Sequence, residues 1–216
     1  MELLGKIFGG VSRVKIIRLF LLNPQQTFAS SDILARTKAS RIAFRKDVAM
    51  LEAIGFIKKR IRGGISKKVP QKGKRAKVVT SKKVIDWGLN PQFQFLDQFR
   101  QLFIDPILLA ESVQVSRFRP VGKLRLVVAS GVFIGDTKSK ADLLIVADSV
   151  KKKPLDIAIK TIESEIGKEL SYAVFTTEDY IYRMSMFDRL VCDFTELPHL
   201  EIFKNMEFST YRSKNI

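Results

Sequence analysis

Apolar side chains recur at helical spacing through the first quarter of the chain. Ser12 and either Ser30 or Ser31 are candidate N-caps, because their hydroxyls can accept hydrogen bonds from the first backbone N–H groups of a helix. Residues 1–10 include three glycines and predict only an entry segment. The pattern predicts helices at 11–23, at 30–37 and from the turn at 37–40 to about residue 54.

After the third helix the pattern changes to one typical of a hairpin. Gly55 can supply a left-handed helix end, Phe56-Ile57 begins a strand-like piece, and Val78-Val79 is a second such piece. A long loop of high positive charge between them is suited to phosphate contact or to entry into a minor groove. Its basic residues are Lys58, Lys59, Arg60, Arg62, Lys67, Lys68, Lys72, Lys74, Arg75 and Lys77.

Residues 87–119 are expected to connect two domains. The composition of Trp87 to Pro91 is typical of a break between domains. The phenylalanines between Phe95 and Phe103 predict an aromatic-rich helix, and a further helix is expected through 107–115. Such an apolar face must be covered. It packs against one of the domains or forms a dimer contact.

Strands and helices alternate in the rest of the chain. The pattern predicts an α/β unit at 120–216, which follows an N-terminal unit at 1–86 and the connector and makes the whole an α+β protein. The expected strands are 124–128, 141–146, 171–175 and 200–203, and the expected helices are 154–167 and one long helix from Thr177 through Phe194.

Charge is concentrated at one end of the chain. Residues 1–90 contain 21 Lys and Arg against 5 Asp and Glu, whereas the remaining residues contain 17 of each, so the entire net charge of +16 belongs to the N-terminal part. A polyanion is the expected partner, and a basic surface kept for solubility is the alternative.

The run Leu51 to Ile57 resembles the junction from recognition helix to wing in winged-helix transcriptional regulators, and the resemblance covers residues 11–83. It implies double-stranded DNA as the partner. The candidate base and phosphate contacts on the third helix are Ser40, Arg41, Arg45 and Lys46, because Arg can bind guanine O6 and N7 together. The alternative is an ordinary charged solvent face.

A second resemblance covers residues 120–204. Gly131-Val132, Gly135 and the run Ser139 to Val146, followed by Glu165 to Arg183, are similar to the nucleotidyltransferase fold related to DNA polymerase beta. In active members a Gly-Ser pair holds a triphosphate, and an Asp-x-Asp pair with a third carboxylate binds two magnesium ions.

This chain departs from that pattern at the reacting positions. Val132 replaces the serine, Lys140 replaces the first aspartate, and only Asp142 matches. Two-metal transfer needs converging carboxylates, so no catalytic residue, metal or cofactor is predicted, and Gly131, Val132, Lys140 and Asp142 form a vestigial site. Such a site could bind a small anionic ligand, or Lys140 could pair with Asp142 or Asp136 in a scaffold, which we favour.

One Cys192 and one His199 are too few for a disulfide or a zinc site, and no apolar run approaches the roughly 20 residues that span a bilayer. A cytoplasmic protein with no membrane partner is expected. The leading hypothesis is a homodimeric DNA-binding transcriptional regulator. The alternatives are a nucleotidyltransferase enzyme guided by the basic domain, and an RNA-binding or toxin-neutralising protein.

Overall fold

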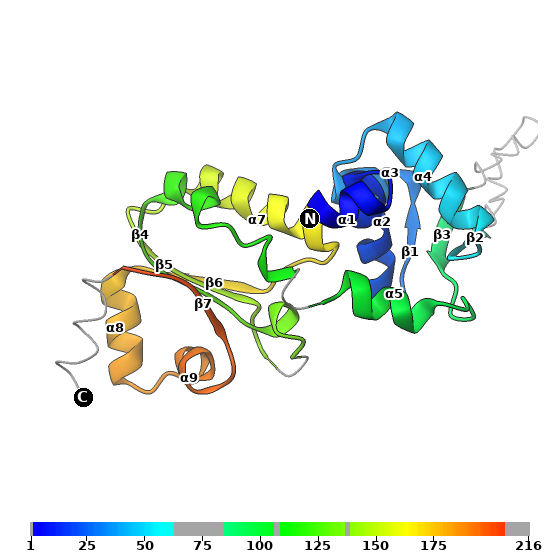
Figure 1. Ribbon diagram of the computed structural model, residues 1–216. Helices are drawn as coiled ribbons and strands as arrows, with labels where there is room; N and C mark the ends of the chain where they lie inside the picture. Colours follow the sequence, from blue (N-terminus) through cyan, green and yellow to red (C-terminus); the bar gives the residue numbers. More distant parts are fainter. Residues whose placement is uncertain (1, 63–83, 106–108, 137–138, 206–216) are drawn as a thin grey trace, which may run out of the picture.

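The chain combines helices with two separate sheets, as the mixed pattern of the sequence predicts (Figure 1). A three-stranded sheet of order β1-β3-β2 belongs to the N-terminal half, and a four-stranded sheet of order β6-β5-β4-β7 belongs to the C-terminal half. The computed structural model describes residues 2–62, 84–105, 109–136 and 139–205. Within these residues no helix has the length and apolar character needed to cross a membrane.

Helices form most of the N-terminal half, and the N-caps of two of them differ from the predicted ones. The segment 1–10 is not only an entry segment, because it contains a helix. Gly10 rather than Ser12 precedes the second helix, and Ala29 precedes the third, where the Asp32 carboxylate accepts the Ala29 N–H at 3.2 Å. Neither Ser30 nor Ser31 is therefore a cap. The helices are α1 (Glu2–Ile7), α2 (Val11–Leu22), α3 (Ser30–Thr37), α4 (Arg41–Ala53) and α5 (Leu96–Phe103).

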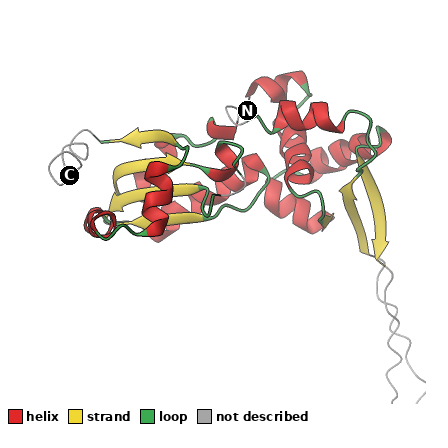
Figure 2. Cartoon of the chain, turned by 90° about the horizontal axis from the view of Figure 1, so that it is seen from below, coloured by secondary structure: helices red, strands yellow, loops and turns green. Residues whose placement is uncertain are grey.

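A two-stranded ribbon projects from this half (Figure 2). Strand β2 (Ile57–Arg62) pairs antiparallel with β3 (Val84–Leu89), and β1 (Thr27–Ala29) pairs with the other edge of β3. The expected break at Trp87 to Pro91 is therefore wrong at its start, and the predicted domain end at residue 86 falls inside the central strand. The predicted strand at Val78-Val79 lies outside the described residues.

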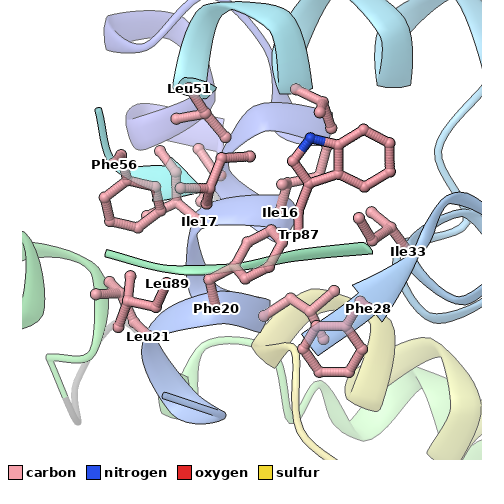
Figure 3. Close-up of a cluster of buried hydrophobic side chains, with 14 of the residues drawn as sticks. Ile16, Ile17, Phe20, Leu21, Phe28, Ile33, Leu51, Phe56, Trp87 and Leu89 are labelled. Carbon is pink, nitrogen blue, oxygen red and sulfur yellow. The ribbon is translucent and has the colours of Figure 1, made fainter. Parts of the chain in front are cut away.

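The core of the N-terminal half lies between α2, α4 and the short sheet (Figure 3). Phe20 and Trp87 lie near its centre and are both buried. Helix α5 covers one side of this core. The ring centroid of Phe99 lies 5.5 Å from that of Phe56, which follows α4, and the ring centroid of Phe103 lies 4.8 Å from that of Phe8, which follows α1. The aromatic-rich helix thus packs against its own half.

The C-terminal sheet is covered by helices on both faces. Buried residues of β4 and β5 alternate between the core under α7 and the core under α8 and α9, as a period of two requires. Strand β6 runs parallel to β5 after the α7 crossover, and the other pairs are antiparallel. The elements are η1 (Val115–Arg117), η2 (Arg119–Val121), β4 (Lys123–Ala129), η3 (Gly131–Phe133), β5 (Leu143–Asp148), α7 (Lys152–Ile166), β6 (Tyr172–Phe175), α8 (Thr177–Ser185), α9 (Arg189–Glu196) and β7 (Leu200–Lys204).

The single long helix expected after Thr177 is two helices. The chain turns at Phe187, whose φ of 52° is left-handed and whose side chain is 81% exposed. Asp188 then caps α9, because its carboxylate accepts the N–H groups of Leu190 and Val191 at 3.0 and 3.3 Å. Phe187 fits the helical period of its neighbours but does not belong to the buried stripe.

Helix α2 joins the two halves by packing against the end of α7 (Figure 1). The buried Arg18 donates from Nε to the Phe103 carbonyl at 2.9 Å and from Nη1 to the Glu165 carbonyl at 3.2 Å. Burial lowers the pKa of Arg18 to about 10, against the raising effect of Glu165 and Glu111, so the group stays charged at neutral pH. The positive end of this side chain therefore meets the carbonyl-rich C-terminus of α7.

Two further contacts close the same junction. Asn23 Nδ2 donates to the Gly167 carbonyl at 2.8 Å, and Arg36 of α3 pairs with Glu169 at 2.9 Å. Gly167 has a φ of +82°, and a Cβ at this position would lie 2.5 Å from the Leu19 backbone nitrogen. Only glycine permits this approach of α7 to α2.

Candidate nucleic-acid interface

Helix α4 begins and packs as the sequence predicts. Ser40 is its N-cap, and its Oγ accepts the Ala43 N–H at 3.2 Å. Phe44, Val48 and Leu51 form the buried stripe that packs on α2 and the sheet. Because the Ser40 hydroxyl oxygen accepts a hydrogen bond from the first turn of α4, its observed role is to cap the helix.

Both acidic residues of α4 make contacts within the protein. The buried Asp47 Oδ1 accepts from Arg13 of α2 through Nη2 at 3.0 Å and Nε at 3.1 Å. Arg13 also donates from Nη1 to the Phe8 carbonyl at 2.7 Å. Glu52 accepts the Trp87 indole N–H at 3.3 Å. The Arg13–Asp47 pair fixes the rotation of α4 about its own axis and keeps one negative charge away from the outer face.

The outer face of α4 is basic. Arg41, Arg45 and Lys46 are all exposed there, as the helical spacing predicts. Two residues that the sequence interpretation did not include share this face, namely Ile42 and Ala49. Ile42 could have been found from the sequence, because it does not fit the spacing of the apolar stripe.

The ribbon that follows α4 also carries exposed cations. Gly55, with a φ of 76°, ends the helix, and Lys58, Lys59 and Arg60 are exposed on β2. Lys58 Nζ lies 3.5 Å from Gln92 Oε1, and Arg62 is the last residue of the strand. The other predicted loop contacts, Lys67, Lys68, Lys72, Lys74, Arg75 and Lys77, lie outside the described residues.

The predicted vestigial site brings three of its four residues together. The Asp142 carboxylate, at the start of β5, accepts the Val132 N–H at Oδ1 and the Ser171 N–H at Oδ2, at 2.9 and 3.0 Å. Gly131 has a φ of +55°, and a Cβ there would run into Asp142 Oδ1. Lys168 Nζ lies 3.8 Å from the same oxygen. Both carboxylate oxygens therefore tie η3 and the segment before β6 to β5.

Lys140 does not join this group. Its Nζ pairs with Asp193 Oδ2 of α9 at 3.6 Å, so the predicted pairing with Asp142 or Asp136 is wrong. Residues 140 and 142 precede Leu143, the first paired residue of β5, so strand alternation does not fix the directions of their side chains, and Lys140 reaches α9 instead. Among the described residues no group of three or more His, Cys, Asp or Glu side chains is arranged to hold a metal ion.

A second carboxylate, Asp148, ends β5 and was missed from the sequence. It accepts the Thr177 N–H at 3.0 Å, the Thr177 hydroxyl at 2.9 Å and the Arg125 Nε at 3.1 Å. Burial alone would raise the pKa of Asp148, but the Thr177 and Arg125 donors outweigh burial and lower it. Asp148 thus joins α8 to the sheet.

Comparison with known protein families, curated proteins and solved structures gave no match, so the functional argument depends on the geometry and charge of this chain.

Proposed function

We propose that the chain is a transcriptional regulator that binds double-stranded DNA with an N-terminal winged helix, in which α4 is the recognition helix and the β2–β3 ribbon is the wing. The observation that carries the proposal is the outer face of α4, where Arg41, Arg45 and Lys46 are exposed while Asp47 is buried against Arg13. A helix with this arrangement fits the width of a B-DNA major groove and can bind guanine edges through its arginines.

The charge distribution supports the same proposal. Residues 1–90 contain 21 basic and 5 acidic side chains, and the ribbon that follows α4 has exposed cations at Lys58, Lys59 and Arg60. Figure 1 places α4 and the ribbon at the end of the molecule away from the four-stranded sheet, so the C-terminal half does not cover them. DNA could therefore approach α4 and β2 together.

For the C-terminal half we propose a scaffold that holds two copies of the chain on two DNA half-sites. The Asp142 contacts support a structural role, because backbone N–H groups occupy both of its oxygens. A second copy would also cover the apolar side chains at the turn between α8 and α9, where Tyr182, Met186 and Phe187 are exposed. Sedimentation of the full chain with and without Phe187→Ser tests this part.

Salt dependence of duplex binding tests the main proposal. The full chain is titrated with a fluorescent duplex at 50 and 200 mM salt. If about six basic groups touch phosphates, the affinity should fall by about 1,000-fold over this range. Binding at 50 mM salt that is no tighter than that of an acidic control protein contradicts the proposal.

A further inference from the structure

Ile42 is the most exposed large hydrophobic side chain within the described residues, at 83%. It occupies the first turn of α4, directly after Arg41. A β-branched residue at an exposed helix position is less favourable than alanine or lysine, since it loses side-chain freedom and gains no burial. The fold of the protein alone therefore does not account for isoleucine at this position.

Ile42 also lies within the basic face rather than at its margin. With about 100° of rotation per residue, it falls between Arg45 and Lys46 around the helix, and the exposed Ala49 lies two turns further along the same line. The buried stripe occupies the opposite side, at Phe44 and Val48. A partner that binds the arginines must also meet this apolar strip.

We propose that Ile42 packs against the C5-methyl group of a thymine, so that the recognised half-site contains a T·A pair beside the base pairs contacted by Arg41 or Arg45. This inference rests on the proposed DNA-binding function. The thymine methyl is the one apolar group that base edges present in the major groove, and guanine O6 and N7 are the acceptors that arginine binds there. Ile42 and its two neighbouring arginines thus match a mixed thymine and guanine sequence.

The charges around Ile42 favour DNA over the other partners. An apolar protein surface that covered Ile42 would also desolvate Arg41, Arg45 and Lys46, which costs free energy unless acidic groups are provided. In RNA, uracil lacks the methyl group, and the major groove of an A-form helix is too deep and narrow for side chains to reach the base edges.

A double-mutant cycle between protein and DNA tests the inference. Full-length protein first selects duplexes from a random library, and each thymine of the selected duplex is then replaced by deoxyuridine, which removes only the methyl group. Wild-type protein should lose about 5-fold to 10-fold in affinity at one or two positions. Ile42→Ala should lose about as much on the thymine duplex and should not respond to deoxyuridine at those positions.

Ile157→Ala is the matched control, because Ile157 is 66% exposed on α7 in the other half and should respond to deoxyuridine as wild-type does. If wild-type and Ile42→Ala respond equally to every deoxyuridine, or if no sequence is selected, the thymine contact is refuted while duplex binding stands. Failure of the full chain to bind any duplex refutes the proposed function as well.

Discussion

The outer face of α4 and the surroundings of the buried Asp142 use charge in opposite ways. On α4 the acids contact the protein and the cations Arg41, Arg45 and Lys46 face outward. Around Asp142 the charge faces inward, and the N–H groups of Val132 and Ser171 bind both oxygens of the carboxylate. A charge satisfied by backbone donors stabilises a fold, whereas exposed cations on a helix whose Asp47 is buried are suited to an external polyanion. The two regions should therefore respond differently to substitution.

The largest effect is expected at Gly131. Gly131→Ala should lower the free energy of unfolding by about 3 kcal/mol or more, because the new methyl group adds a clash with Asp142 Oδ1 to the strain of a left-handed φ. Urea denaturation measures the change. Gly55→Ala separates the two causes, since Gly55 is also left-handed but has no atom within 4 Å of its Cβ position, and it should cost about 1 kcal/mol. Equal losses for both variants would show that the Asp142 contact is not close.

On α4 the expected loss is in binding rather than stability. Arg41→Ala combined with Arg45→Ala should weaken binding to a selected duplex by about 100-fold, which corresponds to about 2.7 kcal/mol, with an unchanged melting temperature. Fluorescence anisotropy measures the affinity. Arg119→Ala with Arg189→Ala removes two exposed arginines from the other half and serves as the control. If both double variants weaken binding equally, net charge rather than α4 determines affinity.

Asp142→Asn should lower the free energy of unfolding by about 2 kcal/mol and leave DNA binding unchanged. An amide nitrogen replaces one acceptor, so one of the two backbone N–H groups loses its partner. The exposed Asp97→Asn removes only a surface pair with Arg100 and should cost less than about 0.5 kcal/mol. Nucleotide transfer by wild-type protein with magnesium, abolished by Asp142→Asn, would instead support the enzyme alternative.

The smallest effect is expected at Asp148 and depends on pH. The folded pKa of Asp148 lies below the unfolded value of about 3.9, so its stabilisation is present above that pH and is lost as the pH falls through the folded pKa. Asp148→Asn should therefore cost about 1 kcal/mol at pH 7, after allowance for partial exposure, and progressively less below about pH 4. Urea denaturation at both pH values measures this. A difference that does not change with pH would contradict the assigned hydrogen bonds.

Periodicity in the sequence predicts the elements that bury one clear face. The strands of the C-terminal sheet and helices α2, α4 and α7 were expected within a few residues of their observed bounds. Periodicity could not predict β3. A long segment separates this strand from its partner β2, and Gly88 is a residue type that is typical of turns. In the structure a Cβ at Gly88 would lie 3.2 Å from Thr27 Cγ2, so the glycine marks a close approach of strands.

For the candidate interface, spacing predicts which residues of α4 face outward but not what holds the helix there. The Arg13–Asp47 pair joins residues 34 positions apart, and nothing local indicates it. The Asp142 contacts join residues 10 and 29 positions apart, and so the resemblance identified the residue but not its hydrogen bonds. The resemblance grouped Lys140 with Asp142 because Lys140 stands at the first aspartate position of the motif, whereas in the structure it pairs with Asp193 of α9.

Helix α2 carries Arg13 and Arg18 little more than one turn apart, and each holds a different part of the molecule. Arg13 holds α4, and Arg18 holds the end of α7. Rotation between the halves would have to break the Arg18, Asn23 and Arg36 contacts together and separate Gly167 from the backbone of Leu19. In a two-fold assembly built through the C-terminal halves, this short stretch of α2 would fix the distance between the two copies of α4. It would thereby determine how many base pairs separate the two half-sites.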